Sequence, residues 1–227
     1  MDINMNYISV AVDGPAGAGK SSVSKTVAKD LGYTYIDTGA MYRCVALFAI
    51  ENGIDIKNDV PTLIAGLDGI KIDMRNTGDG QRVYLNGLDV SERIREEDVS
   101  VGASDVAVIP EVRVKLVDMQ REMAKSANVI MDGRDICSHV LPDAQVKIFL
   151  TASIEARAKR RYDELCRKGI ECDFEKIKSD IAYRDKNDSE REVSPLKKAE
   201  DAVLLDTTEL CFDEVVEKIK ELIINVV

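Results

Sequence analysis

Eight residues near the start of the sequence have the types and spacing of a phosphate-binding loop. In the stretch GPAGAGKS, four residues separate Gly14 from Gly19, and Lys20 and Ser21 follow directly, which fits the Walker A pattern at every fixed position. Glycines let backbone N–H groups turn toward phosphate oxygens, and the positive end of a following helix adds to that attraction. We therefore predict a nucleoside triphosphate site in which Lys20 reaches the β- and γ-phosphates and Ser21 binds Mg²⁺.

The surroundings of this loop favour phosphate binding over a merely structural glycine turn. An apolar run over residues 7–13 precedes the loop, and Val23, Val27 and Leu31 recur every four residues after it. This pattern predicts a strand before the loop and a helix behind it, which is the context in which the motif binds phosphate. Binding alone does not establish catalysis, so the residues that would act on the phosphates must lie elsewhere in the chain.

Two further clusters follow predicted strands. In DTGAMYR, Thr38 can cap a helix that begins there, and Arg43 lies about one turn along, where its fork can contact a phosphate. In VIMDGRD, Asp132 ends an apolar strand, the place where phosphate-transferring enzymes hold the acid that organises Mg²⁺ and its waters. A solvated arginine and a polar turn are the structural alternatives.

The second half of the chain concentrates basic residues in an acidic protein. Arg184, Asp188 and Arg191 are spaced i, i+4 and i+7, which places them on one face of a predicted helix. Arg–Asp pairs on a helix are ordinarily solvent-exposed and contribute little to stability. Phosphoryl transfer gives them another purpose, because its transition state spreads negative charge that only cations from several sides can neutralise. More cations crowd an earlier predicted helix: Arg157, Lys159, Arg160, Arg161, Arg167 and Lys168.

Composition excludes several classes of protein. With 227 residues, 45% hydrophobic and 32% charged, the chain suits one globular domain that carries smaller inserted lobes. The net charge of -10 argues against general nucleic-acid binding. Five scattered cysteines without a CxxC pair predict reduced thiols and a cytoplasmic location. No long apolar run or signal peptide is recognisable, so we expect neither a membrane span nor export.

Short apolar strands alternate with amphipathic helices, which predicts an α/β fold with a parallel sheet covered on both faces. Helices are expected from the glycine loop to Leu31, from Thr38 to Asn52-Gly53 with Met41, Val45 and Phe48 buried, and near residues 110–127. A last helix has the core-facing stripe Phe212, Val215, Val216, Ile219 and Leu222. The predicted strands are 7–13, 33–37, 128–132, 146–150 and 203–206.

Two regions interrupt this alternation. Strands over 70–75 and 81–87, with the hairpin signal Asn86-Gly87, predict a small antiparallel lobe over about residues 63–100. After Thr151, the arginine-rich helix is expected to end at Gly169, and another helix to begin around Asp173.

Taken together, the clusters resemble the bacterial cytidylate (CMP/dCMP) kinases of the nucleoside monophosphate kinase group. The resemblance runs essentially from end to end and implies a P-loop NTPase-type sheet, an inserted antiparallel β lobe and a helical lid. It implies one domain over 1–227, a CMP-binding lobe over 38–105 with the β insert at about 63–100, and a lid over 155–190. The motifs that carry it are VDGPAGAGKS, IDTGAMYR, DVSERIR, VRVKL, MDGRDICSHVLPDAQVKIFLTAS, ARAKRRYDEL, YRDKNDSER, SPL and DAVLLDTT.

The resemblance also implies roles for individual residues. For ATP it implies Gly14, Pro15, Ala16, Gly17, Ala18, Gly19, Lys20, Ser21 and Ser22, with Arg157 and Arg161 as lid groups. Around the CMP phosphate it implies Thr38, Tyr42, Arg43, Arg134, Arg184 and Arg191; at the sugar Asp188; and at cytosine Ser104, Arg113 and Asp135. The catalytic set is Lys20, Arg134, Arg184 and Asp188, and the Mg²⁺ groups are Ser21 and Asp132.

The sequence departs from the family pattern in two places. Cys137, Ser138 and His139 follow the GRD motif where a glycine and a small residue are more usual, and Thr38 replaces a common serine but keeps its hydroxyl. His139 is interpreted as structural, because an ionised acceptor phosphate needs positioning more than proton abstraction.

The expected activity is ATP- and Mg²⁺-dependent phosphorylation of CMP and dCMP by direct in-line transfer, in a cytoplasmic monomer that binds neither nucleic acid nor membrane. Two alternatives remain at this point. One is a P-loop kinase for another small acceptor, such as UMP, AMP or shikimate; the other is a non-enzymatic nucleotide switch.

Overall fold

The computed structural model describes residues 7–77 and 80–226, and the chain divides into two compact units. Unit 1 comprises Met1–Tyr35 and Met123–Val227, and unit 2 comprises Ile36–Glu122. Among the described residues, no helix is both long and apolar enough to cross a bilayer.

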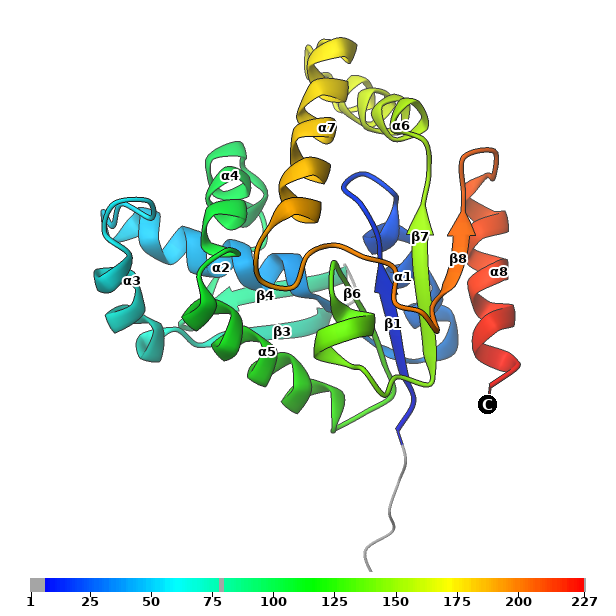
Figure 1. Cartoon of the computed structure of the whole chain (residues 1–227), viewed down its shortest axis with the longest axis horizontal. Helices are drawn as coiled ribbons and strands as arrows, with labels where there is room; N and C mark the ends of the chain where they lie inside the picture. Colours follow the sequence, from blue (N-terminus) through cyan, green and yellow to red (C-terminus); the bar gives the residue numbers. More distant parts are fainter. Residues whose placement is uncertain (1–6, 78–79, 227) are drawn as a thin grey trace, which may run out of the picture. The chain divides into compact units, whose positions relative to one another are not determined.

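A five-stranded sheet with the order β2-β6-β1-β7-β8 lies mainly in unit 1, whose first segment ends within β2. The central pairs β1–β6 and β1–β7 and the edge pair β7–β8 are parallel, and Figure 1 shows β6, β1 and β7 side by side. All five predicted strands are confirmed close to their expected ends. The apolar runs of β1 and β6 are almost entirely buried because helices cover both faces of the sheet. The strands are β1 (Ser9–Asp13), β2 (Thr34–Asp37), β6 (Val129–Gly133), β7 (Val146–Thr151) and β8 (Val203–Asp206).

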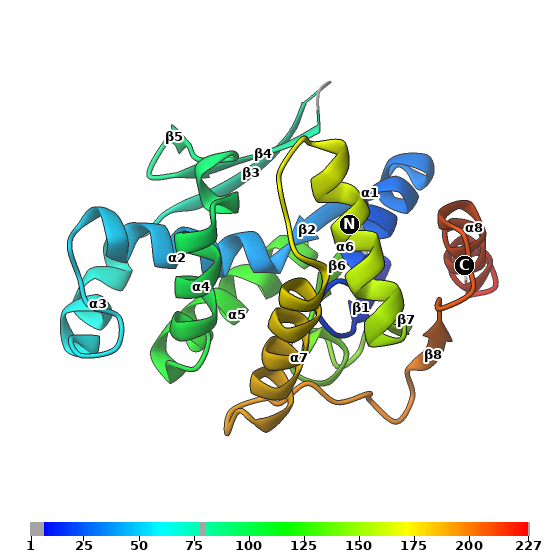
Figure 2. The same ribbon diagram turned by 90° about the horizontal axis from the view of Figure 1, so that it is seen from above.

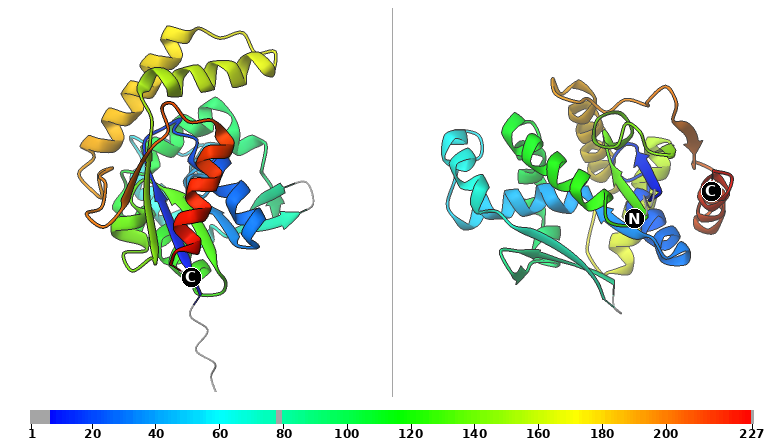
Figure 3. Two further views of the ribbon diagram at one scale, coloured as in Figure 1. Left: turned by 90° about the vertical axis from the view of Figure 1, so that its right-hand side faces the viewer. Right: turned by 90° about the horizontal axis from the view of Figure 1, so that it is seen from below.

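Helices α1 (Lys20–Leu31) and α8 (Phe212–Ile224) pack on this sheet. The left-handed Gly32 ends α1 as predicted, with φ 69°. The red helix α8 runs along the strands in Figure 3. Of its predicted stripe, Val215, Val216 and Ile219 are buried and Leu222 is partly buried, and Ile223 is buried as well. Phe212 was predicted to share this stripe, but 47% of it is exposed, because it opens the first turn of the helix.

Helices α6 (Ile154–Arg167) and α7 (Phe174–Glu190) form a hairpin that follows β7. Ser153 and Asp173 cap their N-termini, each accepting a backbone N–H three residues ahead. The prediction that one helical face carries Arg191 is wrong. Arg191 has φ -60° and ψ 140°, beyond the last turn of α7.

A five-residue π-helical turn that was not predicted, η3 (Ile136–Val140), directly follows Asp135. The five cysteines, all within the described residues, are free thiols.

Unit 2 combines helices with a separate three-stranded antiparallel sheet, β3-β4-β5. Figure 2 shows the three strands lying together. Asn86 and Gly87 have φ values of 51° and 86° in the tight turn between Leu85 and Leu88, which confirms the predicted hairpin. Within the lobe expected at about 63–100, the strands lie at 72–77, 80–85 and 88–89, and residues of α3, η1, η2 and α4 also fall in this range. The elements are α2 (Thr38–Glu51), α3 (Val60–Gly66), η1 (Leu67–Gly69), β3 (Ile72–Thr77), β4 (Gly80–Leu85), β5 (Leu88–Asp89), η2 (Arg93–Arg95), α4 (Glu97–Val106) and α5 (Pro110–Ala124).

Candidate active site

The glycine loop joins β1 to α1, and its first glycine is required by close packing. A Cβ on Gly14 would come within 1.9 Å of the Leu150 carbonyl oxygen on β7. Gly19, with φ 88°, is the N-cap of α1, and no side chain caps this helix end. The first-turn N–H groups of α1 therefore face the loop, as an anion site requires.

Lys20 is folded back onto this loop. Its side chain is 5% exposed, and Nζ donates to the carbonyl oxygens of Gly14 at 2.7 Å and Pro15 at 2.8 Å. Burial and, secondarily, the Arg134 guanidinium lower the pKa of Lys20 to about 7, against the opposing effect of nearby carboxylates. A phosphate beside Nζ would favour its charged form, so the geometry suits an anionic ligand.

Ser21 and Asp132 lie together beside the loop. Ser21 Oγ donates to Asp132 Oδ2 at 2.8 Å, and the Tyr35 hydroxyl donates to Asp132 Oδ1 at 2.6 Å. The sequence interpretation missed Tyr35, whose only signal was its place in a strand next to β6. A hydroxyl and a carboxylate are the hard oxygen donors that Mg²⁺ prefers. No group of three or more His, Cys, Asp or Glu metal ligands exists among the described residues.

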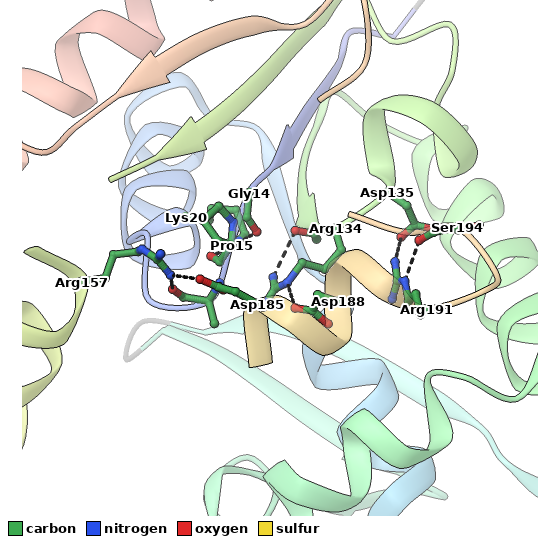
Figure 4. A network of polar contacts seen from close by, with 12 residues as sticks. Gly14, Pro15, Lys20, Arg134, Asp135, Arg157, Asp185, Asp188, Arg191 and Ser194 are labelled. Atoms are coloured by element: carbon green, nitrogen blue, oxygen red, sulfur yellow. Dashed lines mark hydrogen bonds and ion pairs between the residues drawn. The ribbon is translucent and has the colours of Figure 1, made fainter. Parts of the chain in front are cut away.

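Four of the predicted acceptor groups form two ion pairs, shown in Figure 4. Arg134 Nε lies 2.6 Å from Asp188 Oδ2, and Arg191 Nη2 lies 3.5 Å from Asp135 Oδ1. Arg191 Nε also donates to the Ser194 carbonyl oxygen at 2.6 Å. The structure thus brings the GRD segment and the end of α7 together.

The predicted lid arginines differ in their surroundings. Arg157 is 6% exposed and donates to the carbonyl oxygens of Ala152 and Ala16 and to Asp185. Arg161 is exposed and pairs with Glu164 at 2.8 Å. Of these two lid arginines, Arg157 contacts the glycine loop directly. Arg184, which was predicted to bind the acceptor, lies on an exposed part of α7.

A buried acid supports the segment that follows β6. Asp13 is fully buried, and its two oxygens accept the N–H groups of Ile136 and Cys137, each at 2.8 Å. Burial raises the pKa of Asp13, while these N–H donors act to lower it. The carboxylate thus anchors η3 at the residue after Asp135. The sequence interpretation missed this role, although Asp13 directly precedes the loop. His139, in the same turn, is exposed.

Unit 2 carries the remaining predicted acceptor residues. The N-cap of α2 is Asp37, whose Oδ1 accepts the Ala40 N–H at 2.9 Å. The prediction that Thr38 is the cap is therefore wrong by one residue, because Thr38 is already helical. Arg113 is 2% exposed, and its Nη1 donates to the Tyr42 hydroxyl at 3.3 Å. Arg43 is half-buried on α2, whereas Ser104 is exposed on α4.

Comparisons with known proteins show the family to which the chain belongs. The family model described as Cytidylate kinase matches residues 10–225. The cytidylate kinase of Caldicellulosiruptor saccharolyticus is 50% identical over 98% of both chains. That of Bacillus cytotoxicus is 55% identical over 95% of this chain and 96% of its own. An uncharacterized protein from Eubacterium ventriosum has a similar fold, with a TM-score of 0.52 at 12% identity, over 94% of this chain and 96% of its own. On its sequence and over nearly its whole length, this chain belongs to the cytidylate kinase family.

Proposed function

We propose that this protein transfers the γ-phosphoryl group of ATP to CMP or dCMP, giving ADP and CDP or dCDP. The observation that carries the proposal is the family match over residues 10–225. The site chemistry agrees with it, because a phosphate-binding loop and paired basic and acidic groups occur in the same unit. Transfer is direct: an oxygen of the acceptor phosphate attacks in line, and no phosphoenzyme forms.

On the donor side, the loop from Gly14 to Ser22 holds the ATP phosphates through backbone N–H groups within it. Lys20 exchanges its two carbonyl partners for phosphate oxygens and gains positive charge as it does so. Arg157 and Arg161 are the proposed lid groups for ATP, and Arg157 already bonds to the loop at Ala16.

Mg²⁺ accompanies ATP in this proposal. Ser21 and Asp132 would hold the ion, because both offer oxygen donors in one hydrogen-bonded pair. The bound ion would neutralise phosphate charge. This chain's own residues align the acceptor phosphate with the γ-phosphate of ATP.

On the acceptor side, the residues divide by chemistry. Arginines and hydroxyls meet the CMP phosphate: Thr38, Tyr42, Arg43, Arg134, Arg184 and Arg191. Asp188 binds a sugar hydroxyl, and Ser104, Arg113 and Asp135 distinguish cytosine. Asp135 accepts the N4 amino group and Arg113 donates to the O2/N3 edge. The ion pairs of Asp188 with Arg134 and of Asp135 with Arg191 orient these groups before substrate arrives.

The proposal extends to organisation and setting. Residues 1–227 form one nucleoside monophosphate kinase domain, with 38–105 as the CMP lobe and 155–190 as the lid. The protein acts as a cytoplasmic monomer in pyrimidine nucleotide metabolism and uses small-molecule substrates rather than nucleic acid or membrane.

A coupled assay with ATP and CMP, dCMP, UMP or AMP tests the activity. We expect turnover with CMP and dCMP, and its loss when EDTA removes Mg²⁺. Activity confined to AMP would overturn the assignment, and so would triphosphate-dependent binding of a partner protein without any acceptor.

Asp135 gives a sharper test of base recognition. Asp135→Ala should lower kcat/KM for CMP by about 10- to 100-fold, because one hydrogen bond to a charged acceptor is lost. The preference for CMP over UMP should shrink, since uracil places an acceptor where cytosine has its amino group. Asp135→Asn keeps the size of the side chain, and its kcat/KM for CMP should fall between those of the wild type and Asp135→Ala. The exposed Asp143→Ala is the control, and an unchanged CMP/UMP ratio in Asp135→Ala would contradict the role.

A further inference from the structure

Ala16, in the middle of the phosphate-binding loop, has both of its backbone polar groups bonded to the α6–α7 hairpin. Its N–H donates to Asp185 Oδ1 at 3.1 Å, and its carbonyl oxygen accepts from Arg157 Nη1 at 2.8 Å. Arg157 Nη1 and Asp185 Oδ2 are 2.6 Å apart. The three residues therefore form a closed ring of hydrogen bonds. Figure 4 shows its Arg157–Asp185 side near Lys20.

This ring is well placed to fix the loop conformation. The Arg157 and Asp185 side chains are only 7% and 22% exposed, so solvent screens their pairing weakly. Arg157 is itself held by a bond from Nε to the Ala152 carbonyl oxygen at 2.9 Å. A Cβ on Gly17 would lie 3.4 Å from Arg157 Cβ and 3.6 Å from Ile181 Cδ1. The hairpin thus packs against the loop as well as bonding to it.

Such restraint matters because the loop is rich in glycine. Gly17 and Gly19 both have left-handed φ values, and glycine gives the chain more freedom than any other residue. A loop that binds phosphates through its own N–H groups must hold them in one arrangement, and each unrestrained residue lowers the affinity.

We propose that Asp185 is a positioning residue for ATP: with Arg157 it holds the Ala16 peptide groups in the arrangement that the donor phosphates need. The inference rests on the proposed function only in that this loop binds the ATP phosphates. Asp185 touches the loop backbone and not the reacting atoms.

Asp185 also begins a row of ionic contacts at the end of α7. Asp188 and Arg191 follow at intervals of three residues, and they pair with Arg134 and Asp135. The same short stretch therefore ties down both the donor loop and the GRD segment within unit 1.

Direct binding of ADP to Asp185→Ala tests the inference. Calorimetry should show the Kd for ADP raised about 10- to 30-fold, with a similar rise in the KM for ATP, because the Ala16 N–H and Arg157 both lose a charged partner. The KM for CMP should change by less than about threefold. Asp185→Asn, which keeps an oxygen for Ala16 but loses the ion pair, should give a smaller rise.

Asp180→Ala, an exposed position on the same helix, is the matched control and should leave both constants unchanged. An unchanged Kd for ADP in folded Asp185→Ala overturns the proposal. Equal weakening of ADP and CMP with a lowered Tm also overturns it, in favour of general support of the fold. If Asp185→Ala does not fold, Asp185→Asn decides by the same criteria. Because ADP binding needs no acceptor, failure of CMP as a substrate would leave this result intact.

Discussion

At the scale of single residues, the most unusual charge of the site is the buried ammonium group of Lys20. Lys20 is a cation enclosed by protein with two carbonyl oxygens as its partners. Taking an ammonium group out of water costs free energy, which its partners offset only in part. In the nucleotide-free protein Lys20 therefore works against stability, and it becomes favourable when an anion is bound.

The pH dependence of unfolding tests this view of Lys20. Its pKa of about 7 in the folded state lies below the value of about 10.4 for an unfolded lysine. Between these values the unfolded chain binds more protons, so the free energy of unfolding rises with pH, by at most about 1.4 kcal/mol per pH unit. Lys20→Met removes this group, so its free energy of unfolding should rise less from about pH 7 to pH 9 than that of the wild type.

Urea denaturation without nucleotide, at several pH values, measures the difference. The exposed Lys29→Met on the same helix is the control and should keep the wild-type slope. Parallel pH profiles for Lys20→Met and the wild type would show that the pKa of Lys20 is not lowered in the folded state. Nucleotide binding, in contrast, should be severely weakened in Lys20→Met.

At the scale of elements, local sequence patterns predicted the strands and helices that depend on interactions between neighbouring residues. The strands and α1 were predictable because apolar runs, four-residue spacing and a C-terminal glycine are contained in a few neighbouring residues. The errors concern helix ends: Thr38 was taken for the cap instead of Asp37, and Arg191 was placed on α7 when it lies beyond it. Both ends depend on a single backbone rotation that periodicity does not encode.

The cap of α2 gives an element-scale prediction. Asp37→Ala should lower the free energy of unfolding by about 1 kcal/mol, because the Ala40 N–H loses its acceptor at the start of the helix. Asp37→Ser, which can still cap, should recover most of that loss. Thr38→Val keeps the size of that side chain and should leave the cap intact. Urea denaturation of the three variants distinguishes the two residues, and a larger loss from Thr38→Val than from Asp37→Ala would contradict the assignment.

At the scale of the whole molecule, contacts between distant parts of the sequence could not be predicted from local patterns. The glycine loop was predictable because it binds through its own backbone. Its supports were not: Asp185 lies 169 residues from Ala16, the Tyr35 hydroxyl bonds 97 residues away at Asp132, and Asp13 bonds 123 residues away at Ile136. From sequence alone, an acidic residue that anchors a loop cannot be distinguished from one on a solvent-exposed helix surface, because its partner is distant in the sequence.

The division into two units predicts how each nucleotide alone stabilises the chain. All residues assigned to ATP lie in unit 1, namely the loop with Arg157 and Arg161, whereas the CMP assignments occur in both units. A ligand slows amide exchange most strongly in the segments that it holds in the folded state. ADP should therefore slow hydrogen exchange within 14–31 and 154–190, and leave 38–48 and 97–113 nearly unchanged. CMP alone should slow exchange at 38–48 and 97–113. Mass spectrometry of peptides from both complexes measures this, with Lys20→Met as the control for ADP. Protection by ADP confined to 36–122 would contradict the assignment of the donor nucleotide to unit 1, and would require the loop to serve another ligand.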